Sequence, residues 1–192
     1  KIIKKFTYYA YAEACFLSSA FDIESLKILN SLNLDFFKVP SGEINNVPYL
    51  RFLAGLNKKV ILSTGMSNLK EISFALNILK KGGLSKKKIY LLQCNTEYPS
   101  PFVDANLRVL GLFEKKFKIV TGYSDHTPGI QASIVAVSLG AKIIEKHFTL
   151  NKKLKGPDHK ASLDPKEFRN LVISIRCVEE LLGKEKKEIT SS

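Results

Sequence analysis

Long hydrophobic runs, tryptophan and paired cysteines are all missing from this sequence. It contains no Trp, one Met and three cysteines, at Cys15, Cys94 and Cys177. A chain with no run of about 18 apolar residues has no membrane-spanning helix, so we expect no membrane partner. Widely spaced cysteines in odd number exclude a disulfide scaffold and indicate a reducing compartment. The N-terminal residues also lack the apolar segment of a signal peptide, and we therefore expect a cytoplasmic protein.

Acidic residues are scarce relative to basic ones. The chain has 30 Lys and Arg against 18 Asp and Glu, a formal net charge of +12. Strong positive charge is common in nucleic-acid-binding proteins, but here the lysines form short runs over the whole chain. The runs lie at residues 4–5, 80–81, 86–88, 115–116, 152–153 and 184–187. This spread favours a solvated surface and no nucleic-acid partner, with weak steering of an anionic substrate left open.

Apolar residues, by contrast, make up 45% of the chain, enough for one domain with its own core. Short apolar runs alternate with stretches of helical periodicity. The runs predict strands at residues 36–40, 60–63, 89–92, 118–121 and 142–145, and a sixth at 15–18. The helical stretches begin near capping residues at Asp22, Asn68, Asp104, Thr127 and Asp164. This alternation predicts an α/β fold with a parallel sheet and right-handed crossovers.

A barrel and an open sheet both fit the alternation. No Gly-x-Gly-x-x-Gly follows any predicted strand, which disfavours a dinucleotide-binding sheet. Polar residues follow nearly every strand, as on the rim of a barrel, rather than meeting at one switch point. We therefore predict a TIM (β/α)8-type barrel. A complete barrel takes ~250 residues, so residues 1–192 are expected to form a partial barrel of about six βα units that lacks the first two strands.

Two of the three histidines follow neighbouring predicted strands. His126 lies just past one strand and His147 at the end of the next. Rings on the same barrel rim can share a divalent ion, and the absence of a third protein ligand leaves positions for substrate oxygens and water. The alternative stays open that one histidine caps a helix and the other packs in the core.

Lys38 stands inside an apolar strand and is followed at once by Ser41 and Glu43. A buried ammonium needs an anion. Three uses remain open: a structural pair with Glu43, a Schiff base, or a clamp on phosphate or carboxylate. Ser63 and Ser124 add hydroxyl groups at two other strand ends.

Two loop residues have open interpretations. Asp158, in a Gly-Pro-Asp-His turn, either holds a sugar hydroxyl or serves the turn itself. Tyr98, in Glu-Tyr-Pro, either contacts a polar substrate or packs its loop.

Six segments taken together resemble the sialic acid synthase (N-acetylneuraminate synthase) family. They read KVPSGEINN at 38–46, LSTGM at 62–66, CNTEYPSP at 94–101, GYSDHT at 122–127, EKHFT at 145–149 and GPDHKAS at 156–162. The sequences NTEYP at 95–99 and DHKAS at 158–162 are most similar to those of bacterial members, including legionaminic acid synthases. The resemblance implies a TIM barrel that condenses phosphoenolpyruvate with N-acetylmannosamine or a related amino sugar, using Mn or Mg. It also implies a homodimer and a C-terminal antifreeze-like domain, which is absent from these 192 residues.

The same resemblance implies roles for particular residues. The implied metal ligands are His126 and His147. The implied phosphoenolpyruvate-binding groups are Lys38, Ser41, Ser63, Ser124 and, as a looser match, Ser19. At the sugar and the reacting centre it implies Glu43, Tyr98 and Asp158, with Lys38 and Glu43 as the catalytic pair. Thr96 stands where some members have Asn, which leaves the sugar open, and Gln93 stands where His is common.

Two other functions compete with the synthase. A Schiff-base aldolase would use Lys38 and need no metal. A non-catalytic remnant would bind ligand without turnover. Because two strands and a domain are expected to be missing, we expect these 192 residues alone to be inactive or unstable.

Overall fold

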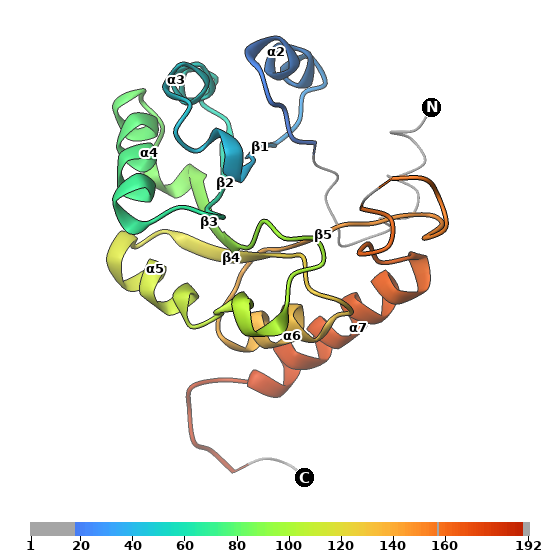
Figure 1. Ribbon diagram of the computed structural model, residues 1–192. Coiled ribbons are helices and arrows are strands. Elements are labelled where there is room, and N and C mark those ends of the chain that lie inside the picture. Colours follow the sequence, from blue (N-terminus) through green and yellow to red (C-terminus); the bar gives the residue numbers. More distant parts are fainter. Residues whose placement is uncertain (1–17, 157, 190–192) are drawn as a thin grey trace.

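The computed structural model describes residues 18–156 and 158–189, and their five strands form one curved parallel sheet (Figure 1). The strands are β1 (Phe36–Val39), β2 (Lys59–Ser63), β3 (Ile89–Cys94), β4 (Val120–Asp125) and β5 (Ile144–Lys146). Each strand pairs in parallel with the next one along the chain. The order therefore never reverses, as a doubly wound sheet would require, and the sheet forms a half-barrel.

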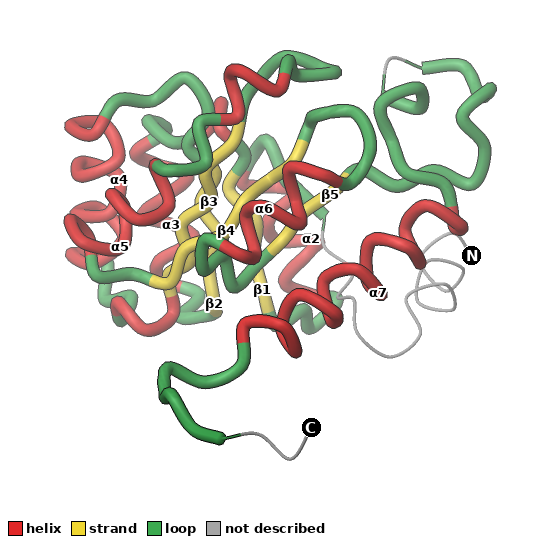
Figure 2. The backbone as a smooth tube through the Cα atoms, turned by 90° about the horizontal axis from the view of Figure 1, so that it is seen from below, coloured by secondary structure: helices red, strands yellow, loops and turns green. Residues whose placement is uncertain are grey.

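Helices cover the outer side of this sheet (Figures 1 and 2). They are α2 (Ile23–Ser31), α3 (Val47–Gly55), α4 (Leu69–Lys81), α5 (Val109–Phe117), α6 (Gln131–Ser138) and α7 (Pro165–Leu182). Three short 3-10 turns lie in loops: η1 (Ser41–Glu43), η2 (Lys86–Lys88) and η3 (Phe102–Ala105). Within the described part of the chain, no helix has both the length and the apolar character to cross a membrane.

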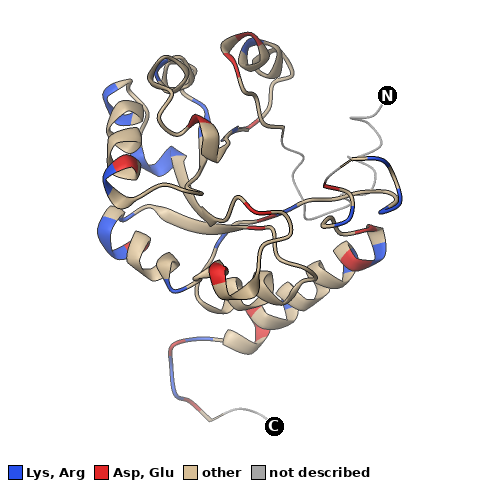
Figure 3. Cartoon of the chain, in the orientation of Figure 1, with Lys and Arg blue, Asp and Glu red and all other residues tan. Residues whose placement is uncertain are grey.

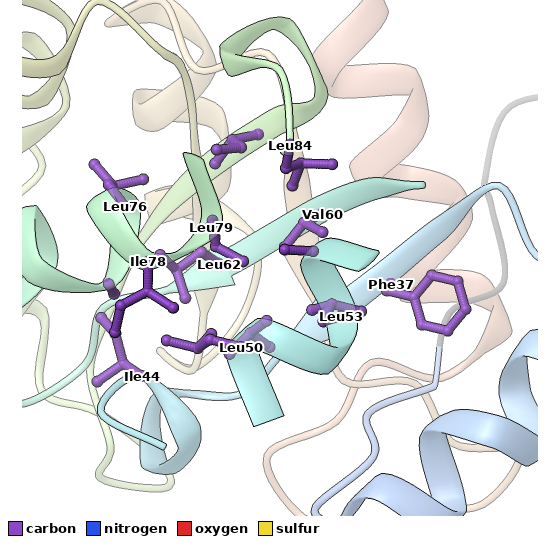
Figure 4. Packing of buried hydrophobic residues seen from close by; sticks show 14 of the residues in the cluster. Phe37, Ile44, Leu50, Leu53, Val60, Leu62, Leu76, Ile78, Leu79 and Leu84 are labelled. Atoms are coloured by element: carbon purple, nitrogen blue, oxygen red, sulfur yellow. The ribbon is translucent and has the colours of Figure 1, made fainter. Parts of the chain in front are cut away.

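The main core fills the space between the outer face of the sheet and helices α3 and α4 (Figure 4). Buried side chains in it include Phe37, Leu50, Leu53, Leu62 and Leu79. Side chains alternate between the two faces of a strand. Since Phe37 and Val39 both enter this core, the residue between them, Lys38, must face the concave side.

A second cluster packs β4 against α6. Tyr123 lies in it with three alanines, Ala132, Ala136 and Ala141, and all four are buried. Tyr123 thus faces the helices. Its strand neighbour Ser124 is directed to the concave side for the same reason of alternation.

The five central strand predictions are confirmed in place, although each differs from its predicted limits by one to four residues at one end or both. β4 runs to Asp125 rather than ending at residue 121. Its last residues include Ser124 and Asp125, so the strand continues beyond the apolar run from which it was predicted. β5 begins at Ile144, two residues later than predicted. Of the sixth predicted strand, residues 15–17 lie outside the described residues, while Ser19 forms an isolated parallel bridge with Lys38.

Three predicted helix caps are confirmed, since Asp22, Asn68 and Asp164 each accept a backbone hydrogen bond at their helix starts. Two predicted starts are wrong. The helix expected from Asp104 begins only at Val109, because Asn106 adopts a left-handed backbone that interrupts it.

The helix expected from Thr127 and Pro128 begins at Gln131 instead. Gly129 lies between Thr127 and the observed start and has a left-handed backbone (φ 71°) that an α-helix does not contain, so Thr127 is separated from the helix. Its backbone N–H and its hydroxyl donate to Asp125 Oδ1 instead.

Lysine and arginine lie over α4, α5, the loop before α7 and the C-terminal segment (Figure 3). This distribution agrees with the scattered surface charge expected from the sequence; the lack of a nucleic-acid partner stays a prediction. Cys94 and Cys177 are free thiols, and Cys15 lies outside the described residues.

Candidate active site

The carboxyl ends of all five strands meet at one edge of the half-barrel, where the active sites of (β/α)8 barrels lie. Lys38 is buried on the concave side, and its Nζ lies 3.0 Å from Glu145 Oε1. The second carboxylate oxygen, Glu145 Oε2, is buried and has no hydrogen-bond partner. A charged group in this position can therefore accept a further donor from a ligand.

The structural pair between Lys38 and Glu43, one of the three uses predicted for the lysine, is wrong. Glu43 Oε2 instead accepts a 2.6 Å hydrogen bond from Asn46 Nδ2. The reason is local: the 3-10 turn η1 carries Glu43 away from the strand and toward Asn46, three residues later. Glu43 remains half-buried in the loop directly after β1.

The three predicted serines occupy three different strand ends. Ser41 Oγ accepts from Gly65 N at 3.0 Å and lies 3.2 Å from Cys94 Sγ. Ser63 Oγ is buried without a hydrogen-bond partner. Ser124 Oγ lies 3.5 Å from His126 Nε2. Because Val60 and Leu62 enter the main core, Ser63 faces the concave side of β2, where its unpaired hydroxyl is free to bond a ligand.

The two predicted histidines are brought together with Tyr98. The ring centroids of His126 and His147 lie 5.3 Å apart, and that of Tyr98 lies 4.1 Å from His126 and 5.3 Å from His147. We call these three residues the histidine cluster. Asp158 Oδ2 lies 3.9 Å from His147 Nδ1 and is exposed to solvent.

Ser19 and Thr96 adjoin the other groups less directly. Ser19 bridges to Lys38 on the neighbouring strand. Thr96 is exposed, and its Cγ2 borders Gly65: a Cβ added to that glycine would lie 2.8 Å from Thr96 Cγ2 and 2.9 Å from Ser41 Oγ. Thr96 therefore lines the Ser41 side of the edge, with no contact to the histidine cluster among the described interactions.

One ring nitrogen of His126 is committed to the backbone. His126 Nδ1 lies 2.6 Å from the carbonyl oxygen of Asn95. A carbonyl only accepts, so Nδ1 carries the proton and Nε2 keeps its lone pair. Burial lowers the pKa of His126, the hydrogen bond to Asn95 opposes that effect, and the charge of His147 lowers it further. His126 therefore favours the neutral form, which is the form that binds metal ions.

These donors fit a divalent ion held partly by substrate. The Nε2 lone pair of His126 is free of the backbone, and Glu145 Oε2 is unpaired nearby in the same half-barrel. Among the described residues no group of three or more His, Cys, Asp and Glu could enclose an ion. Two imidazoles would leave open positions for substrate oxygens and water. The interpretation of a histidine as a helix cap is wrong, because α6 begins at Gln131 with Ile130 before it.

Sequence reasoning missed two groups at this edge. Glu145 was not singled out, although a glutamate at the end of an apolar strand is a signal comparable to Lys38. Asn95 contributes only a backbone carbonyl, for which no side-chain pattern exists.

A parallel half-barrel with a buried lysine and two adjacent histidines on its carboxyl edge defines an α/β-barrel-type protein with a polar site. The chain belongs to the NeuB family, whose family model matches residues 3–187. This confirms the family predicted from the six segments.

Known relatives agree with that assignment. The N,N'-diacetyllegionaminic acid synthase of Campylobacter jejuni is 52% identical over 185 residues, which cover 95% of this chain and 55% of that protein. The N-acetylneuraminate-9-phosphate synthase of Mus musculus is 42% identical over 175 residues, covering 91% of this chain and 48% of that protein. The chain thus spans about half the length of these curated relatives.

A solved structure shows the same fold. The crystal structure of N-acetylneuraminic acid synthetase from Leptospira borgpetersenii, in complex with citrate, matches with a TM-score of 0.83 and 36% identity. The match covers 89% of this chain and 59% of that one. The α/β half-barrel is therefore shared with a sialic acid synthetase.

Proposed function

We propose that the protein containing this chain condenses phosphoenolpyruvate with an acetylated amino sugar, giving a nonulosonic acid and phosphate. The observation that carries the proposal is the ion pair of Lys38 and Glu145 at the same edge as the histidine cluster. The lysine suits an anionic substrate, and the two histidines would hold a divalent ion. Membership of the NeuB family and 52% identity to a legionaminic acid synthase support it.

The phosphoenolpyruvate is assigned to the Lys38 side of the edge. An ammonium has three donors, and Glu145 takes one of those of Lys38. The remaining donors can hold a phosphate or carboxylate oxygen, and the unpaired hydroxyl of Ser63 can donate to another. The proposed phosphoenolpyruvate-binding residues are Lys38, Ser41, Ser63, Ser124 and, more loosely, Ser19.

The sugar is assigned to the histidine cluster. We propose His126 and His147 as ligands of one Mn or Mg ion, which when bound polarises the sugar aldehyde. Tyr98 covers both rings, and burial raises its pKa, so its hydroxyl stays a neutral hydrogen-bond donor. Asp158 and Thr96, which are both exposed to solvent, are the proposed contacts of sugar hydroxyl or acylamino groups.

The bond changes then follow from these positions. Lys38 and the serines hold the enol ester so that its C3 attacks the aldehyde carbon, forming a carbon–carbon bond while the aldehyde oxygen takes a proton. C2 becomes oxocarbenium-like and adds water, and the C2–O bond to phosphate then breaks. Glu43, held by Asn46 beside the phosphate-binding residues, stabilises that cation or accepts the proton of the water.

Two alternatives are weaker on this geometry. A Schiff base at Lys38 would break its ion pair and leave the partly buried Glu145 carboxylate without its cation, which is costly. A non-catalytic remnant that only binds ligand needs no acid–base carboxylate, whereas Glu43 is kept in the loop after β1 and held by Asn46. We therefore favour the synthase over the aldolase and the remnant.

The wider setting of the chain is part of the same proposal. We propose residues 1–192 as part of the barrel domain of a longer homodimeric protein, in keeping with relatives of which the match covers 48–55%. A cytoplasmic location fits the free thiols of Cys94 and Cys177.

The test is phosphate release by the full-length protein with phosphoenolpyruvate, Mn and each of two sugars, N-acetylmannosamine and a diacetylated relative. We expect sugar-dependent release of phosphate and a nonulosonic acid detected by mass spectrometry. Binding of phosphoenolpyruvate without phosphate release, for any sugar, would support the remnant instead. A product formed from pyruvate rather than phosphoenolpyruvate would support the aldolase.

A further inference from the structure

A second ion pair lies behind the histidine cluster, on the helix-covered face of the sheet. Lys146 Nζ lies 3.1 Å from Asp125 Oδ2, and the two side chains are 1% and 0% exposed. The residues are register partners at the carboxyl ends of β5 and β4. Asp125 directly precedes His126, and Lys146 directly precedes His147.

The pair also binds the chain on the other side of His126. Asp125 Oδ1 accepts from the backbone N–H of Thr127 at 2.8 Å and from its hydroxyl at 2.7 Å. Lys146 Nζ donates to the Thr127 carbonyl at 2.5 Å. Ser133 in α6 donates to Asp125 Oδ2 at 2.6 Å. The residue after His126 is thus held at its N–H, its hydroxyl and its carbonyl.

The His126 ring is restrained in the same way. Its Nδ1 donates to Asn95 O at 2.6 Å, and its own carbonyl accepts from Ser100 N at 2.9 Å. With the ring and both flanking peptides held, a shift of the β4 end moves the ring directly. The position of His126 relative to His147 therefore depends on how the ends of β4 and β5 are joined.

Stability alone does not account for this ion pair. Replacing a buried ion pair by apolar residues of similar volume is often neutral or stabilising, because the desolvation cost of both charges is removed. Apolar side chains would nevertheless leave the three polar groups of Thr127 without these partners. What the charges supply is a defined register of two strand ends and a defined turn around His126.

We propose that Asp125 and Lys146 are a positioning pair that holds the rings of His126 and His147 at the separation one divalent ion requires. The inference rests on the proposed function, since the two histidines are ligands only by that proposal. Neither Asp125 nor Lys146 touches substrate or metal in this scheme. Both act through the residues that follow them.

The test uses Asp125→Asn and Lys146→Met in the full-length protein, with Mn affinity and the absorption spectrum of bound Co as readouts. Residues that orient metal ligands typically change metal affinity by 10–100-fold. We expect Mn binding to weaken by about that factor and the Co spectrum to change in protein that circular dichroism shows to be folded. Because both changes break one pair, the double variant should lose less than the sum of the two.

The matched control is Tyr123→Phe. Tyr123 lies on the same strand and the same face as Asp125, and its buried hydroxyl has no hydrogen-bond partner among the described residues. Removing that hydroxyl should leave Mn affinity and the Co spectrum unchanged. Native affinity and an unaltered spectrum in folded Asp125→Asn and Lys146→Met would overturn the positioning role.

If a single variant does not fold, the double variant Asp125→Asn/Lys146→Met decides, because it leaves no unpaired buried charge. If the wild-type protein holds no ion at His126 and His147, the proposed function fails at that step. The positioning role is then judged from crystal structures of the variants. An unchanged separation of the two histidine rings in them would overturn it.

Discussion

Lys38 Nζ and Glu145 Oε1 lie 3.0 Å apart, and this contact joins the first strand of the sheet to the last across 107 positions of sequence. Five strands in a flat sheet, at about 4.8 Å each, would place the outer two about 19 Å apart, farther than these side chains reach. The ion pair therefore requires the sheet to curve strongly toward its concave face. It also marks the position at which an anionic substrate can meet the lysine.

Lys38→Met removes the proposed anion-binding group, and we expect kcat/KM for phosphoenolpyruvate to fall at least about 100-fold. The single variant also leaves Glu145 as an unpaired, partly buried carboxylate, which destabilises the fold. Lys38→Met/Glu145→Gln separates the two effects, because it removes both charges. We expect the double variant to regain thermal stability and stay as inactive as Lys38→Met. Recovery of activity with stability would show that the lysine is only structural.

Reduction with borohydride tests whether Lys38 forms a covalent bond. We expect no increase in the mass of the full-length protein after treatment with phosphoenolpyruvate or a keto acid, because the ammonium is held in an ion pair with Glu145. Intact-mass spectrometry provides the measurement, and peptide mapping would locate any adduct. An adduct on Lys38 would support the Schiff-base aldolase and contradict the proposed phosphoenolpyruvate-dependent synthase.

Chelation and two histidine variants test the metal proposal. His126→Ala and His147→Ala should each abolish the Mn-dependent turnover that a chelator also removes from the wild-type protein. His159→Ala is the matched control, because His159 Nδ1 is hydrogen-bonded to Thr149 Oγ1 at 2.7 Å and His159 lies outside the histidine cluster. We expect that variant to keep its activity. Full turnover by His147→Ala in the presence of chelator would show that the reaction does not require a metal ion at the two histidines.

Features that depend on neighbouring residues were predictable from the sequence. The caps at Asp22, Asn68 and Asp164 involve groups at most three residues apart, and all three form. The cap expected at Thr127 failed because the left-handed backbone of Gly129 delays the helix to Gln131. Local patterns therefore predict helix starts well until a residue in the left-handed conformation, such as Asn106 or Gly129, interrupts the first turn.

Long-range pairs were only half predictable. The sequence showed that Lys38 needs an anion, but the partner depends on the curvature of a sheet and proved to be Glu145 rather than nearby Glu43. His126 and His147 were placed together correctly because parallel neighbouring strands end at one edge. The order of the strands can be predicted from the alternation of strands and helices. Predicting the partner of a buried charge also requires the curvature of the sheet.

Gly65 tests the Ser41 side of the edge, where backbone and side chains approach closely. A Cβ at this position would lie 2.8 Å from Thr96 Cγ2 and 2.9 Å from Ser41 Oγ, so Gly65→Ala must displace both side chains or the loop that carries residue 65. We expect KM for phosphoenolpyruvate to rise about tenfold, equivalent to about 1.4 kcal/mol of lost binding, with a smaller change in kcat. Steady-state kinetics with the full-length protein measures both.

Two further variants decide what the Gly65→Ala result means. Gly111 lies within α5 with open space around it, so Gly111→Ala should leave KM unchanged and stabilise the helix by about 0.5–1 kcal/mol, measured as a higher melting temperature. Gly65→Ala/Thr96→Ser removes the methyl group that the new Cβ meets, and should recover much of the lost affinity if the clash with Thr96 dominates. A native KM for Gly65→Ala would show that Ser41 does not border the phosphoenolpyruvate site.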